Sequence, residues 1–284
     1  MTHPTHRRLT PLAALALLAP LAACDSQMEI NGQKGVPLAE VELAGPPPSE
    51  VVLASGDKVI VTDGATFTIK VEGSDTESLR FVRDERTIGI TREDGWSGKQ
   101  TATIRITMPP PSELVIAGAG TIEAQSLGKE ASVSIGGAGT ITFGKAAADK
   151  LGINIGGSGT VRGAGTAKVL EVNIGGNGDV ELAGLKADTA EVLIGGKGDV
   201  AFAFDGAVEA NIGGSGNIKV AGNAKCTVNA FGSGTLTCTP TSSGATAAIP
   251  AAAAAPAEAG VPIAPQVPIA PKVPTAPIAA KPAQ

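Results

Sequence analysis

The sequence predicts an all-β fold in which one chain winds into a single-stranded parallel β-helix. Three observations predict it. A Gly-x-Gly motif returns seven times, the spacing between its copies is nearly constant, and apolar and polar residues alternate on both sides of each copy. Alternation with a period of two is the signature of strands that bury one face.

The repeat has a period of 18–20 residues. Successive copies are 19, 20, 19, 20, 18 and 18 residues apart, counted from the first glycine of each motif: Gly118, Gly137, Gly157, Gly176, Gly196, Gly214 and Gly232. Leucine-rich repeats have a similar length, but the chain lacks their leucine pattern, and helical repeats need longer units with fewer glycines. A solenoid with coils of this length therefore remains.

The alternation assigns each side chain to the core or to the surface. Apolar residues stand two and four positions before each first glycine and four positions after it, as Ile153, Ile155 and Val161 do around Gly157. Each coil is then a strand, a glycine turn, a second strand and a variable return. The polar residues between the apolar ones face water and form the candidate binding surface: Asn154, Asn173, Asn211 and Asn229 before the turn, and Thr160, Asp179, Asp199 and Asn217 after it.

The glycines are expected to serve the turn. Each coil must corner at the same place, where stacked neighbours leave little room for a Cβ and a positive φ is often required. A phosphate-binding loop would need a G-x-G-x-x-G or Walker pattern that opens a helix, whereas each turn here leads into a strand. "GGNGD" and "GGKGD" are similar to calcium-binding nonapeptide repeats, but Asp179 and Asp199 come one residue early and the period is twice nine. We expect neither a metal nor a cofactor.

The two ends differ in composition from the middle. Residues 1–23 have a basic start and an apolar run, as a secretory signal peptide does. "LAAC", which ends at Cys24, resembles the lipobox of bacterial lipoproteins, and ordinary cleavage at a nearby site is the alternative. We expect a signal peptide over 1–23, lipidation at Cys24, a linker over 24–48, the β-helix over 49–239 and an Ala/Pro-rich disordered tail over 240–284.

Composition excludes several classes of function. Removal of the signal takes two arginines from the 22 basic residues and leaves 20 against 27 acidic ones, a net charge of −7, so nucleic acid is not expected as a partner. Both histidines, His3 and His6, leave with the signal, which excludes imidazole as a metal ligand or a catalytic base. No catalytic residue is assigned.

Cys226 and Cys238 are expected to form a disulfide. They stand six residues before and six after Gly232, and the same positions one coil earlier hold Val208 and Val220. Both cysteines therefore face inward and replace a pair of core residues, and an exported chain meets oxidants. Two buried free thiols are the alternative.

The order of parts resembles one family. Strand-rich segments over 49–112 lead through "RITMPPPSELVIAGAG" into "GINIGGSG" coils, and this arrangement is similar to the bacterial head GIN domain family of autotransporter adhesin heads over Val51 to Thr239. The resemblance implies a right-handed β-helix and a location in the cell envelope, and it carries no catalytic residues.

Two classes of function fit these features. The favoured interpretation is a non-enzymatic envelope lipoprotein that presents stacked polar rows to a glycan or a protein and meets the membrane through its lipid anchor. It would face the periplasm, and Asp25, which resembles a retention signal, favours the inner over the outer membrane. The alternatives are a purely structural envelope protein or a polysaccharide-active enzyme, whose candidate groups would be Asp179, Asp199, Arg162, Glu181 and Lys219.

Overall fold

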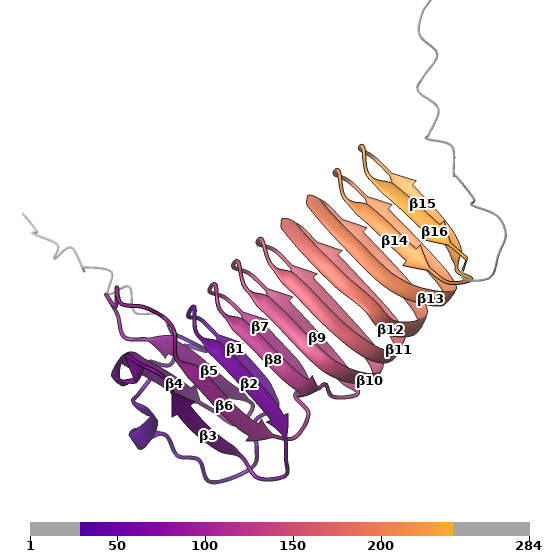
Figure 1. Ribbon diagram of the computed structural model, residues 1–284. Helices are drawn as coiled ribbons and strands as arrows, with labels where there is room; N and C mark the ends of the chain where they lie inside the picture. Colours follow the sequence, from indigo (N-terminus) through magenta and orange to yellow (C-terminus); the bar gives the residue numbers. More distant parts are fainter. Residues whose placement is uncertain (1–28, 241–284) are drawn as a thin grey trace, which may run out of the picture. The chain divides into compact units, whose positions relative to one another are not determined.

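A computed structural model describes residues 29–240 of the chain, as sixteen strands and two short 3₁₀ helices (Figure 1). The predicted signal peptide, Cys24, Asp25 and nearly all of the Ala/Pro-rich tail lie outside these residues. No helix within 29–240 has the length and apolar character that crossing a bilayer requires. The strands are β1 (Glu50–Leu53), β2 (Lys58–Asp63), β3 (Thr68–Glu72), β4 (Leu79–Arg83), β5 (Thr87–Arg92), β6 (Thr103–Met108), β7 (Glu113–Ile116), β8 (Thr121–Ser126), β9 (Glu130–Ile135), β10 (Thr140–Ile155), β11 (Thr160–Ile174), β12 (Asn177–Ile194), β13 (Lys197–Ile212), β14 (Asn217–Ala221), β15 (Lys225–Ala230) and β16 (Thr235–Thr239).

The strands stack into two walls around one core, and this confirms the predicted parallel β-solenoid. The first wall holds the segments that precede each glycine turn, in the order β4, β5, β1, β7, β9, the second halves of β10 to β13, and β15. The second wall holds the segments that follow each turn, in the order β3, β6, β2, β8, the first halves of β10 to β13, β14 and β16. From β1 and β2 onward every pairing within a wall is parallel.

Strands β10 to β13 belong to both walls, because each continues through the return bend between them. Strand β10 alone spans 16 residues. The register shifts at the bend, between Phe143 and Ala146 where β10 meets β11, and between Arg162 and Ala164 where β11 meets β12. A coil thus has one sharp corner at the glycines and one bent strand at the return.

The core fills the space between the walls as the alternation predicts. Ile153, Ile155 and Val161 are at most 1% exposed. Large and small residues complement one another between coils, because Phe143 stacks over Gly163 and a Cβ on that glycine would strike the phenyl ring. Close packing of this kind leaves little space for a buried ligand.

The glycine turns are explained by close approach and not by backbone conformation. A Cβ on Gly137, Gly157 or Gly176 would lie less than 3.0 Å from the carbonyl oxygen of the first motif glycine in the preceding coil. None of the seven first glycines has a positive φ. The expected lack of room is therefore confirmed, and the expected positive φ is wrong: the chain corners with ordinary dihedral angles, and stacking alone excludes a side chain.

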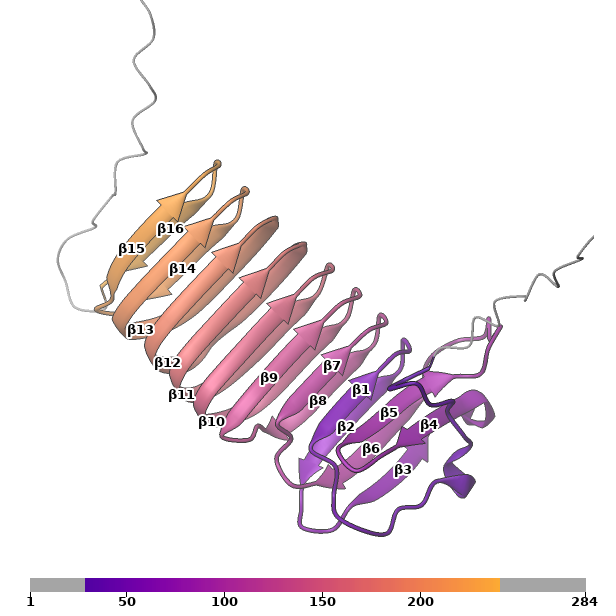
Figure 2. The same cartoon turned by 180° about the vertical axis from the view of Figure 1, so that it is seen from behind.

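The segment over 49–112 is more than a lead into the solenoid. Strands β1 and β2 pair parallel with β7 and β8 and form a full coil, whose corner is Ser55 to Asp57 in place of a Gly-x-Gly motif. The segment also closes the end of the stack, since β4 pairs antiparallel with β5 and β3 pairs antiparallel with β6. Figure 2 shows these strands at the opposite end of the stack from β15 and β16.

A buried ion pair joins the parts of this closed end. Asp57 accepts hydrogen bonds from Arg92 Nε (2.8 Å), from the backbone N–H of Ala102 (2.9 Å) and from the Ser55 hydroxyl (2.8 Å). The side chains of Arg92 and Asp57 are 5% and 0% exposed. Arg92 also donates to the Ser78 hydroxyl at 2.6 Å, so the pair links the corner of the first coil to β5, to the residue before β6 and to the segment before β4.

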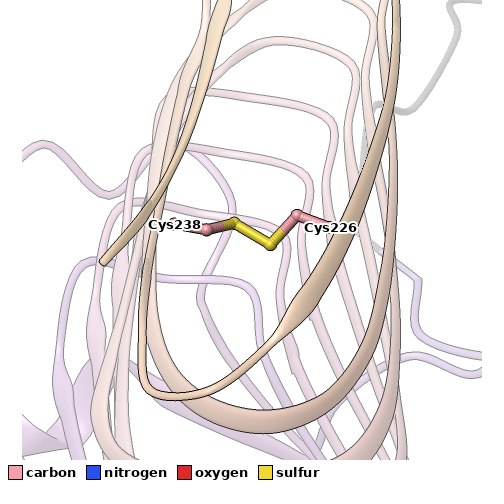
Figure 3. Close-up of a disulfide and its surroundings, with 2 residues drawn as sticks. All are labelled: Cys226 and Cys238. Atoms are coloured by element: carbon pink, nitrogen blue, oxygen red, sulfur yellow. A yellow bond between two sulfur atoms is a disulfide. The ribbon is translucent and has the colours of Figure 1, made fainter. Parts of the chain in front are cut away.

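The predicted disulfide between Cys226 and Cys238 is confirmed. The bond crosses the core of the last coil from β15 to β16, with the two Cα atoms 6.8 Å apart (Figure 3). Cys226 lies in register with Val208 and Cys238 with Val220, which is the core pair that the spacing assigned to them.

Candidate functional site

The eight polar residues predicted to form a surface lie in two rows on opposite walls. Asn154, Asn173, Asn211 and Asn229 lie on the first wall, and Thr160, Asp179, Asp199 and Asn217 lie on the second. All eight point away from the core, half-buried or exposed. A flat ligand can therefore contact one row or the other, so the two rows are separate candidate surfaces.

The first-wall row is a ladder of amides with one apolar gap. Asn173 donates to Asn154 Oδ1 and Asn229 donates to Asn211 Oδ1, each at 3.2 Å. Leu193 lies between the two pairs, in register with Asn173 and Asn211, and is 48% exposed. Each amide uses one donor or one acceptor on its neighbour and keeps the rest of its capacity for solvent or a ligand.

The second-wall row is bonded along its length. Asn217 donates to Asp199 Oδ1 at 2.9 Å, and Thr235 of the next coil donates to Asn217 Oδ1 at 2.8 Å. The backbone N–H of Asp199 reaches Asp179 Oδ1 at 3.4 Å. These bonds connect Asp179, Asp199, Asn217 and Thr235 in one continuous chain along the wall.

A third row, of glutamates, was not predicted. Glu171, Glu191 and Glu209 lie in register on successive strands of the first wall, next to the amide row. Only Glu171 has an ion-pair partner among residues 29–240, Lys150 at 2.8 Å. Like charges directly opposite one another destabilise a sheet. The residues stand five positions before each first motif glycine, so a search for repeated charge would have found them.

The first wall is also hollowed along these rows. One shallow groove of about 390 Å³ includes Glu171, Glu191 and Glu209 together with Val169, which is 37% exposed. A second groove of about 450 Å³ continues from Glu171 toward the closed end of the stack. Its lining includes Asn154, which belongs to the amide row. Grooves, amides, carboxylates and exposed apolar side chains thus coincide on one wall.

Among the charged residues considered for catalysis on the second wall, Arg162 and Glu181 pair with each other. Arg162 donates to both carboxylate oxygens of Glu181, at 2.8 and 3.0 Å. The hydrogen bonds from Arg162 hold the pKa of Glu181 below its usual value. Ala201 separates Glu181 from Lys219 along the row. The groups proposed for a polysaccharide-active enzyme therefore form a solvent-exposed strip, not two carboxylates that face each other across a cleft.

Two neighbouring carboxylates, Glu50 and Glu113, lie near the closed end of the first wall. Burial, and then the charge of Glu50 in the neighbouring strand, raise the pKa of Glu113. The two residues line an open polar hollow of about 480 Å³ together with Asp84 and Arg86. Glu50 accepts a hydrogen bond from the Thr87 hydroxyl at 2.8 Å, which fixes it as part of the scaffold.

Metal-ligating residues and Trp96 were the remaining candidates for contact with a ligand. Within residues 29–240 no three His, Cys, Asp or Glu side chains gather in a way that could hold a metal ion. Trp96 packs against the guanidinium of Arg92, 5.7 Å from its ring, and is half-buried in that contact. The single tryptophan therefore covers the buried ion pair and does not stand free on a wall.

Comparison with known proteins identifies one sequence family and several crystal structures of similar fold. The family described as "Putative auto-transporter adhesin, head GIN domain" matches residues 47–224. A crystal structure of a "putative adhesin" from Bacteroides fragilis is 19% identical, with a TM-score of 0.59, over 67% of this chain and 91% of its own. A "putative lipid binding protein" from Parabacteroides distasonis is 18% identical, with a TM-score of 0.52, over 67% and 92%. No curated protein matches the sequence.

Proposed function

The chain belongs to the head GIN domain family, and from this premise we propose that it is a non-enzymatic lipoprotein of the cell envelope whose solenoid binds a glycan or a protein. The single observation that carries the proposal is the first wall, on which an amide row, a glutamate row and two shallow grooves run along the same side of successive coils. The two structural relatives are named a "putative adhesin" and a "putative lipid binding protein", and neither name is that of an enzyme.

The chemistry of the first wall suits a hydroxyl-rich or amide-rich ligand. Asn side chains offer both donors and acceptors, and carboxylates accept hydrogen bonds from hydroxyl groups. Successive coils repeat the same groups about every 4.8 Å, so a polymer that lies along the stack can engage several coils at once. Each contact is exposed and weak, and the avidity of such a surface comes from repetition.

The proposed address rests on the N-terminal sequence. A cleaved signal that ends at Cys24 would leave a diacylated or triacylated cysteine at the start of the mature chain, and more than one acyl chain holds a protein stably on a membrane. The chain would face the periplasm. Metabolic labelling with a palmitate analogue tests this: the wild type takes up label and Cys24→Ala does not, and equal labelling of both would disprove the anchor.

A glycan array probed with the purified chain tests the binding surface. The first-wall variant Asn173→Ala/Asn211→Ala should lose most of the signal of the wild type. The control variant Thr160→Ala/Asn217→Ala removes two polar groups from the opposite wall and should bind as the wild type does. Equal loss in both variants, or in neither, would contradict the assignment to the first wall.

The same material tests the absence of catalysis. We expect no release of reducing ends or unsaturated sugars from any envelope polysaccharide, since the candidate charges are exposed on one wall and no two carboxylates face each other across a cleft. Release that Asp179→Asn or Asp199→Asn abolishes would establish the enzyme instead.

A further inference from the structure

No segment within residues 29–240 covers the C-terminal end of the stack. Among the described residues β15 pairs with β13 alone and β16 with β14 alone, so each wall ends in an open edge. The N–H of Phe231 donates to Ile212 O and that of Thr235 to Gly216 O, and the carbonyl of Thr239 accepts from Gly222. Successive backbone groups of a strand point to alternate sides. The groups in between, on Cys226, Val228, Ala230, Leu236 and Cys238, therefore point outward from the end of the stack.

The core is also incompletely covered at this end. Val208, Ala210, Ile218 and Val220 in the coil before are at most 2% exposed, because the last coil lies over them. Their counterparts in the last coil, Cys226, Val228, Leu236 and Cys238, are only partly buried. At the last turn Phe231 is 86% exposed, the most exposed of the large apolar residues in the described part of the chain.

At the other end of the stack the edge strands β4 and β3 are protected from pairing with another chain. Val36 exchanges two backbone hydrogen bonds with Phe81 on the free side of β4, at 2.9 and 2.8 Å. Strand β3, the last strand of the second wall, carries Lys70 and Glu72. Covering segments and charged residues are the usual means by which proteins prevent edge strands from pairing. By contrast, β16 carries no charge and β15 carries only Lys225.

The chain after Thr239 is too short between prolines to close the end. A coil of this solenoid takes 18–20 residues to cover both walls, but only nine residues separate Pro240 from Pro250. Proline has no N–H to donate to a strand and is excluded from the interior of a sheet. From Pro250 onward prolines recur every few residues, so the sequence of the tail offers no segment of coil length without proline.

We propose that the open end binds the same end of a second copy of this chain, and that the edge strands β15 and β16 of the two copies pair antiparallel about a two-fold axis. A two-fold contact uses one surface twice and closes on itself, whereas the covered and charged end of the stack prevents growth into a fibre. The pairing satisfies the outward backbone groups, covers the last core layer and buries Phe231. The inference is independent of the ligand proposed for the first wall.

The test measures the mass of the full mature chain, in density-matched detergent, by sedimentation over a wide concentration range. The wild type should show a reversible monomer–dimer equilibrium. Ala230→Pro removes an outward N–H that β13 does not use, and the two-fold repeats the loss, so the Kd should rise roughly tenfold or more. Ala230→Val keeps the N–H and should dimerise as the wild type does.

A second pair of variants tests the apolar contribution. Phe231→Ser should weaken the dimer, while Val169→Ser removes an exposed apolar side chain from the middle of the first wall and should not. Far-UV circular dichroism confirms that each variant keeps its strands. A wild type that is monomeric throughout overturns the proposal, as does undiminished dimerisation of both Ala230→Pro and Phe231→Ser. A full chain that is monomeric but dimerises when shortened after Pro240 assigns the edges to the tail and also overturns it.

Discussion

Two adjacent glycines in one turn should respond oppositely to the same substitution. Gly175 and Gly176 begin the motif between β11 and β12. A Cβ on Gly175 meets no atom within 4 Å, whereas a Cβ on Gly176 collides with the carbonyl oxygen of Gly157 in the coil below. Neither glycine has a positive φ, so backbone strain does not distinguish the two positions.

The magnitude follows from these contacts. To admit the Gly176→Ala methyl group the two coils must separate locally. This overpacking costs about 1–3 kcal/mol, and the loss of the hydrogen bond from Asn177 N to Gly157 O (2.9 Å) costs roughly 1 kcal/mol more. Gly175→Ala restricts only the unfolded chain and should stabilise by about 0.4–1 kcal/mol. The restriction of the unfolded chain is common to both variants, so they should differ by about 2 to 4 kcal/mol.

Urea unfolding followed by far-UV circular dichroism measures the difference. The midpoint for Gly176→Ala should fall well below that of the wild type, and the midpoint for Gly175→Ala should be equal or higher. If both variants lost similar stability, the glycines would be required by the backbone conformation of the turn, and the argument from close stacking would be refuted.

Three further outcomes are expected. Replacing Cys226 and Cys238 by alanine should lower the free energy of unfolding by about 3 kcal/mol. Replacing both by valine, the pair found one coil earlier, should lower it less. Thiol counting on the denatured, unreduced wild type should find neither cysteine reactive. Asp57→Ala leaves Arg92 buried without its counterion and should cost about 3–5 kcal/mol in urea unfolding, and a cost below that of an exposed ion pair would argue against the buried bridge. For Asp84, burial raises the pKa, but hydrogen bonds from a neighbouring amide and from two backbone N–H groups outweigh it and hold the pKa below its usual value. Its stabilising contribution should be complete above the pKa of the unfolded chain and lost as the pH falls through the lower folded value. An NMR titration that finds an ordinary pKa would contradict this.

The repeated part of the fold could be predicted because its rules are local. The glycine spacing fixed the coil length, and alternation around Gly157 placed Ile153, Ile155 and Val161 in the core, where they lie. The same parity paired Cys226 with Cys238, because both occupy positions that hold an inward pair, Val208 and Val220, in the coil before. In a solenoid each coil meets only its neighbours, so a local pattern repeated in sequence becomes a pattern repeated in space.

The candidate surface was predicted less completely. The eight polar residues face outward, as predicted. The prediction combined them into one surface, but the glycine turn between the two rows places the rows on opposite walls. The row of Glu171, Glu191 and Glu209 was not predicted, because the predicted polar positions were those three residues before and after each first motif glycine, and the glutamates stand five residues before it. Which charges neutralise each other, as Arg162 and Glu181 do, depends on register between coils.

By itself the sequence determined the length of the coil, its inward and outward faces and the disulfide between Cys226 and Cys238. These features could be predicted because strand alternation and the steric exclusion of side chains at stacked glycines depend on residues within one coil and its neighbours. Only the tertiary structure decided how the stack ends. At one end Asp57 and Arg92, 35 residues apart, meet in a buried pair beside antiparallel strands, and the coil there corners without the glycine motif. At the other end β15 and β16 have open edges among the described residues. A terminal coil has a neighbour on one side only, so the repeat cannot specify what covers it, and long-range contacts must.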